Sequence, residues 1–101
     1  MTTRLPYVHA SEFESDKIAI TMPIGENHEQ VLSFYRKDWE ALPSRVVEEP
    51  SFAHPGSTMI TVTYFSSGTR EYSHSFDLTP EAREEFYRII DTVKFDDVVK
   101  G

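Results

Sequence analysis

The sequence contains no cysteine and only four glycines. The absence of cysteine excludes disulfides, thiol nucleophiles and metal centres with cysteine ligands. The glycines are isolated from one another, so neither the G-x-G-x-x-G pattern nor the P-loop pattern of nucleotide-binding loops occurs. A G-x-S-x-G nucleophile motif is absent too. These standard signatures of catalysis and nucleotide binding therefore give no support to an enzyme.

Long hydrophobic runs are also missing. The longest apolar-rich stretch, Ile18–Ile24, is interrupted by Thr21 and Pro23, whereas a membrane-spanning helix needs about 20 apolar residues. The N-terminal residues contain no apolar run of the length that a signal peptide requires. We therefore expect a cytoplasmic protein that does not bind membranes.

Basic residues are scarce relative to acidic ones. Ten Lys and Arg face seventeen Asp and Glu, which gives a formal net charge of −7. Affinity for nucleic acid comes from basic side chains that neutralise phosphates, so this balance argues against a nucleic-acid partner. The acidic residues are spread along the chain and do not form a tail.

The chain does contain enough apolar residues for one core. Seven Phe, five Tyr and one Trp, within 39% apolar residues, exclude a disordered chain. A length of 101 residues is typical of one domain. We therefore predict a single domain over residues 1–101, with residues 1–15 irregular or a short strand and residues 95–101 a frayed tail.

Two elements are predicted in the first half of the chain. Asp16–Ile24 alternates in the way of a half-buried strand, with Ile18, Ile20 and Met22 on one face. The following Glu26–Leu42 is predicted as a helix, because its apolar residues fall on one arc at about 100° per residue. The arc consists of His28, Val31, Leu32, Tyr35, Trp39 and Leu42, with Asn27 as the cap.

A hairpin is predicted over Thr58–Leu78, after a short edge strand at Ser44–Glu49 and a loop at residues 51–57. Directly opposed residues must share a face of the sheet, and a three-residue loop at Ser66–Gly68 satisfies this condition. The resulting pairs are Val62 with Tyr72 and Ile60 with His74. The apolar face then carries the isoleucine, valine, tyrosine and phenylalanine side chains, and the other face carries Thr and Ser.

The C-terminal helix is predicted to begin at Thr79-Pro80, because threonine caps helices and proline suits the first helical position. Its apolar stripe is Ala82, Phe86, Ile89, Ile90 and Val93. The element order is therefore β-α-β-β-β-α. This order predicts an α+β fold in two layers, with one antiparallel sheet and two helices packed on one face.

Acidic and aromatic side chains outside the apolar stripes are the first candidate site. We predict that the stripe on the C-terminal helix binds a protein partner, together with exposed aromatic anchors. The candidates are Glu81, Glu84, Glu85, Asp91, Phe34 and Phe65. The alternative interpretation of the acidic stripe is an ordinary solvated helix face.

His74 is the second candidate, because the alternation places it on the apolar face. A pocket between sheet and helix, lined by Trp39, Tyr72 and His74, would bind a small ligand. His74 could also act as an acid or base, although spacing places no second catalytic group beside it. The alternative is a structural histidine bonded to a carbonyl or a tyrosine hydroxyl. The four histidines are unclustered, so no metal or other cofactor is expected.

These observations predict a small acidic binding protein without catalytic activity. It would act through protein–protein contacts, in the manner of an inhibitor, an immunity protein or an adaptor, on a partner that is basic. The small-ligand module is the alternative function. The short edge strand and the Thr-rich sheet face are also compatible with a homodimer.

Overall fold

The computed structural model describes residues 4–24, 28–66 and 69–99 of the chain. Within these residues the strands form two separate three-stranded antiparallel sheets, with orders β1-β2-β3 and β4-β5-β6. The first sheet comprises β1 (Tyr7–Ala10), β2 (Lys17–Ile24) and β3 (His28–Tyr35). The second comprises β4 (Val46–Pro50), β5 (Thr58–Ser66) and β6 (Arg70–Leu78). The α+β class is confirmed, but the prediction of a single sheet with two helices on one face is wrong.

Strand β2 is the centre of the first sheet. The predicted alternation is confirmed, because Ile18, Ile20 and Met22 have no exposed surface. The opposite face of β2 is covered as well: Ala19 and Thr21 are each 2% exposed. Both edges of β2 are paired as well, with β1 on one side and with β3 on the other.

The helix predicted at Glu26–Leu42 is wrong. Residues 28–35 form β3, and a single turn of helix, α1 (Arg36–Glu40), and a 3-10 turn, η1 (Leu42–Arg45), follow it. Leu32 and Phe34 also satisfy a period of two, and pairing with β2 buries both of them. Phe34, predicted to lie outside the apolar arc, is only 1% exposed. The predicted cap, Asn27, lies outside the described residues.

The hairpin of β5 and β6 confirms the predicted faces. Its register pairs Ser66 with Arg70, so three residues, 67–69, separate the strands, whereas the predicted loop was 66–68. The true pairs are Val62 with His74 and Ile60 with Phe76. Each residue of β5 therefore meets a residue two positions further along β6 than predicted. A shift of two positions preserves the face, so the apolar side chains still point inward.

The main helix, α2 (Pro80–Thr92), begins as predicted. The Thr79 hydroxyl accepts a hydrogen bond from the Ala82 amide at 3.2 Å, and Pro80 occupies the first turn. Residues 95–98, predicted to be part of a frayed tail, instead form a short helix, α3 (Phe95–Val98). Phe95 is 4% exposed, because its ring joins the core.

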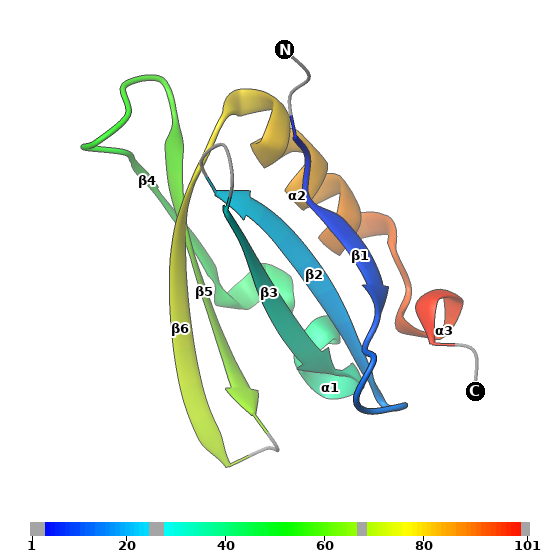
Figure 1. Ribbon diagram of the computed structural model, residues 1–101. Helices are drawn as coiled ribbons and strands as arrows, with labels where there is room; N and C mark the ends of the chain where they lie inside the picture. The colour runs from blue at the N-terminus through cyan, green and yellow to red at the C-terminus, as the bar shows by residue number, and fades with distance from the viewer. Residues whose placement is uncertain (1–3, 25–27, 67–68, 100–101) are drawn as a thin grey trace.

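The two sheets and α2 share one hydrophobic core. Figure 1 shows α2 behind β1, and α2 contacts β1, β6 and η1. The inward side chains of β2, β3, β5 and β6 meet the buried stripe of α2, which consists of Ala82, Phe86, Ile89 and Ile90. Among the described residues, the longest helix is too short and too polar to cross a membrane.

The burial of Phe34 gives a direct test of the strand assignment. We expect Phe34→Ala to lower the free energy of unfolding by about 3–5 kcal/mol, because it leaves a cavity among packed rings. Phe52, which is 96% exposed, is the matched control, and Phe52→Ala should change stability by less than about 0.5 kcal/mol. Urea denaturation measures both values. Equal, small effects would mean that Phe34 is a surface residue.

Candidate functional site

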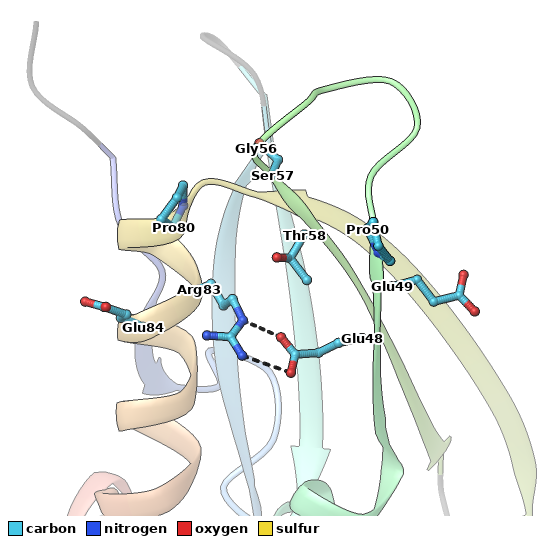
Figure 2. A pocket seen from close by; sticks show the side chains of 9 residues that line it. All are labelled: Glu48, Glu49, Pro50, Gly56, Ser57, Thr58, Pro80, Arg83 and Glu84. Carbon is cyan, nitrogen blue, oxygen red and sulfur yellow. Dashed lines mark hydrogen bonds and ion pairs between the residues drawn. The ribbon is translucent and has the colours of Figure 1, made fainter.

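An open groove lies between the first turn of α2 and strand β4 (Figure 2). Its volume is about 600 Å³. Strand β4 and the loop that follows it form one wall, and the start of α2 forms the other. The residues that line the groove are Glu48, Glu49, Pro50, Gly56, Ser57, Thr58, Pro80, Arg83 and Glu84.

An ion pair connects the two walls of this groove. Arg83 Nη2 donates to Glu48 Oε2 at 3.0 Å, and Arg83 Nε donates to Glu48 Oε1. The hydrogen bond from Arg83 is the main reason why the pKa of Glu48 lies below its ordinary value, and desolvation opposes it. Burial, reinforced by the nearby Glu48 carboxylate, raises the pKa of Tyr87 to about 12. The Arg83 guanidinium also lies 5.2 Å from the centroid of the Tyr87 ring.

The remaining charge of the groove is negative. Glu48 already neutralises Arg83, so Glu49 and Glu84 contribute two further carboxylates. Figure 2 shows these two side chains pointing outward on opposite sides of the Arg83–Glu48 pair. Both residues are exposed to solvent.

Apolar side chains lie close to the groove in the sequence. Val47 precedes Glu48 on the edge strand β4 and is 58% exposed. Phe52, in the loop that leads to Gly56, is 96% exposed. Exposed large apolar side chains next to charged ones are typical of protein-binding surfaces.

The acidic side chains predicted for partner binding all lie on α2, but they are not equivalent. Glu81, Glu84 and Asp91 are exposed, and Glu84 lines the groove. Glu85 is half-buried and forms an ion pair with Arg88 one turn later. Fewer carboxylates of the predicted acidic stripe are therefore available to a binding partner than the sequence pattern indicates.

The two aromatic anchors predicted beside these acids are not free surface rings. Phe34 is buried, with its ring centroid 4.8 Å from that of Tyr64. Phe65 is half-buried, and the Arg45 guanidinium lies 5.0 Å from its centroid. Arg45 is in turn held by Asp38 at 2.9 Å, so Phe65 belongs to a structural cluster.

His74 connects the two sheets. The side-chain amide of Gln30, on β3, donates to His74 Nδ1, on β6, over 2.6 Å. The His74 ring is half-buried and nearly parallel to the rings of Tyr64, Tyr72 and Phe76, at centroid distances of 5.8, 6.5 and 6.4 Å. His74 thus has a structural hydrogen-bond partner, as the interpretation of a structural histidine expected. That partner is a glutamine amide, and not the carbonyl or tyrosine hydroxyl that was predicted.

Of the three residues predicted to line a ligand pocket, Trp39 is held apart from Tyr72 and His74, whose rings are neighbours. Trp39 is 3% exposed and donates its indole N–H to the Val93 carbonyl at 3.0 Å. The Trp39 ring contacts Phe34, Phe34 contacts Tyr64, and Tyr64 in turn contacts the rings of Tyr72 and His74. Tyr72, at 38% exposed, lies at the outer margin of this series of rings. Buried rings fill the space between Trp39 and the other two residues.

The other histidines are dispersed. His28 and His54 are exposed, whereas His9 is half-buried and its Nε2 lies 2.9 Å from the Thr21 hydroxyl. Over residues 4–24, 28–66 and 69–99, no cluster of three or more His, Asp or Glu side chains has the arrangement of a metal site.

Sequence reasoning missed the residues on the β4 side of the groove. Glu48 and Glu49 fell within the predicted edge strand, and Arg83 fell on the predicted helix, but their contact depends on where α2 packs. The separation of 35 residues between Arg83 and Glu48 leaves no local signal. The one available hint was Arg83 itself, a basic residue between acidic ones in the first turns of a helix.

No family model, curated protein or solved structure matches this chain. The function must therefore be argued from the geometry of its own residues.

The Arg83–Glu48 pair predicts a specific pH dependence. The carboxyl pKa is lower in the folded than in the unfolded chain, so the pair stabilises the fold above the unfolded value of about 4.3. That stabilisation is lost as the pH falls through the lowered folded pKa. In Arg83→Gln, we expect the pKa of Glu48 to rise toward its ordinary value. The loss of folding stability that this pair causes at low pH should then disappear.

Carbon-detected NMR titration of the Glu48 carboxyl and urea denaturation at several pH values measure the two effects. The control is Arg88→Gln, which removes the ion pair with Glu85 on the same helix and should leave the titration of Glu48 unchanged. If both variants moved the Glu48 titration equally, the shift would reflect overall charge and not this contact.

Proposed function

We propose that the protein is a small non-catalytic binding protein, of the inhibitor, immunity or adaptor type, that contacts a basic protein partner. The groove between α2 and β4 carries this proposal. Arg83, the one cation among the described residues that line it, is already neutralised by Glu48, and Glu49 and Glu84 leave a net negative charge. Charge complementarity with a basic segment would speed the encounter and orient the partner.

A protein, and not a simple cation, fits the surroundings of the groove. The exposed Phe52, in the loop that follows β4, offers an apolar contact, and an aromatic anchor at an interface supplies much of its binding energy. Among the described strands, β4 pairs with β5 alone, so its other edge is available to an extended segment. The exposed Glu81 and Asp91 continue the negative surface along α2.

The structural role of His74 supports a function without catalysis. Its Nδ1 accepts the hydrogen bond that joins β3 to β6. A cytoplasmic location belongs to this proposal and rests on the sequence features described above.

Charge reversal tests the groove with a defined probe, a ten-residue peptide of alternating lysine and leucine. We expect the peptide to shift the amide NMR signals of β4, of residues 51–58 and of the first turn of α2. Replacing both Glu49 and Glu84 by Lys should weaken binding at least about tenfold, because attraction at two sites becomes repulsion. Raising the ionic strength from about 0.05 M to about 0.3 M should weaken binding to the wild-type chain as well.

The control replaces two exposed acids away from the groove, Glu40 and Glu71, by Lys. Both double variants change the net charge from −7 to −3, since each substitution adds two positive charges. Equal weakening in the two variants, or signal shifts spread over the whole surface, would contradict a specific site at the groove.

A further inference from the structure

A second hollow lies on the outer face of the β1-β2-β3 sheet, away from the core. Its volume is about 320 Å³, near the lower limit for small-ligand pockets. The middle strand supplies its floor, since Ala19 and Thr21 point outward there and are each 2% exposed. The first turn of the chain, at residues 11–13, forms part of its rim.

The strand register explains why this face is hollow. Thr21 pairs with Tyr7 on one side and with Val31 on the other, so a small side chain lies between two large ones. Alternation places all three on the same outer face. Tyr7 and Val31 remain 51% and 54% exposed, so both side chains are accessible to a ligand in the hollow.

The turn between β1 and β2 places a further ring at this hollow. Phe13 lines it and is 91% exposed. The Ser11 hydroxyl accepts hydrogen bonds from the amides of Phe13 and Glu14, at 3.3 and 3.4 Å, and these bonds fix the turn. Burial in the core therefore does not explain the position of Phe13.

Three polar side chains at the hollow, those of His9, Thr21 and Glu29, have partners. His9 Nδ1 donates to the Ala10 carbonyl at 3.1 Å, and its Nε2 accepts from the Thr21 hydroxyl at 2.9 Å. Glu29 forms an ion pair with Arg4. Glu12 also lines the hollow, and it has no ion pair or hydrogen bond with the residues that the structure describes.

We propose that this hollow binds a small organic cation with apolar substituents, such as an alkylammonium group. The faces of the Tyr7 and Phe13 rings attract a cation through their quadrupoles, and the Glu12 carboxylate supplies the opposite charge. Val31 and Ala19 offer contact to the alkyl groups. An anion would meet the Glu12 carboxylate, and a neutral molecule would leave it without a partner. The site lies on a different face from the groove and does not depend on the proposed function.

Choline is the probe, and neohexyl alcohol is its neutral isostere, in which a tert-butyl group replaces the trimethylammonium group. Titrations are followed by amide NMR signals. We expect saturable shifts at Tyr7, Phe13 and Val31 with choline, and binding of the isostere weaker by at least about threefold, the effect of one exposed cation–π contact. Equal binding of the two molecules, or no saturable shift with choline, would overturn the proposal.

Two variants separate the ring from the charge. Phe13→Leu keeps an apolar side chain but removes the quadrupole, and Glu12→Gln keeps the size but removes the charge. Each variant should weaken the binding of choline about 3- to 10-fold and leave the weak binding of the isostere unchanged. Both residues are exposed, so the variants should fold, and the amide spectrum confirms this. Phe52→Leu is the matched control, and an equal effect there, or none in the two variants, would refute the cation site.

Discussion

The burial of strand β2 on both faces is the constraint on which the rest of the structure depends. Its inward residues, Ile18, Ile20 and Met22, contribute to the core that the two sheets share with α2. Its outward residues, Ala19 and Thr21, are small, so the larger side chains of the flanking strands extend further from the sheet than they do. One strand therefore sets both the packing of the interior and the shape of an outer surface.

Polar bridges complement this apolar packing where elements from distant parts of the sequence meet. Gln30 and His74 join the two sheets, and Arg83 and Glu48 join α2 to the edge strand β4. Asp38, although buried, is compensated by Arg45 next to it. Because a buried charge without a partner is costly, the Asp38–Arg45 pair disfavours alternatives that would separate its two residues.

Local signals were sufficient for the elements whose pattern allows a single interpretation. Thr79 and Pro80 marked the start of α2, and the rule that opposed residues share a face identified the inward side of the hairpin. The loop position was wrong by one residue because the sequence gives little preference between Ser66 and Thr69 as the end of the turn. The segment at residues 28–35 was ambiguous: Val31, Leu32 and Tyr35 fit a helical arc, whereas Leu32 and Phe34 fit a strand. Pairing with β2 decided the outcome, and pairing is not visible in a single segment.

The candidate site was less accessible to prediction than the fold, for the same reason. The exposed acids of α2 followed from helical periodicity, but their partners across the groove depend on tertiary packing. Phe34 was assigned to a surface anchor because residues 28–35 were taken for part of a helix. Once these residues form a strand, the Phe34 ring belongs to the interior. Trp39, in α1, was correctly included among the apolar residues, but its ring is packed in the core and lines no pocket with Tyr72 and His74.

The outer face of the hairpin has a further consequence for how this molecule behaves in solution. Thr61 bonds to Ser75 at 2.8 Å and Thr63 to Ser73 at 2.9 Å, so hydroxyl groups from the two strands satisfy one another across the sheet. Such a ladder offers a neighbouring molecule neither an apolar area to cover nor an unmet hydrogen-bonding group to satisfy. Glu71 and Asp77 lie on the same face of β6 as Ser73 and Ser75, so their negative charges also oppose the docking of an identical surface there.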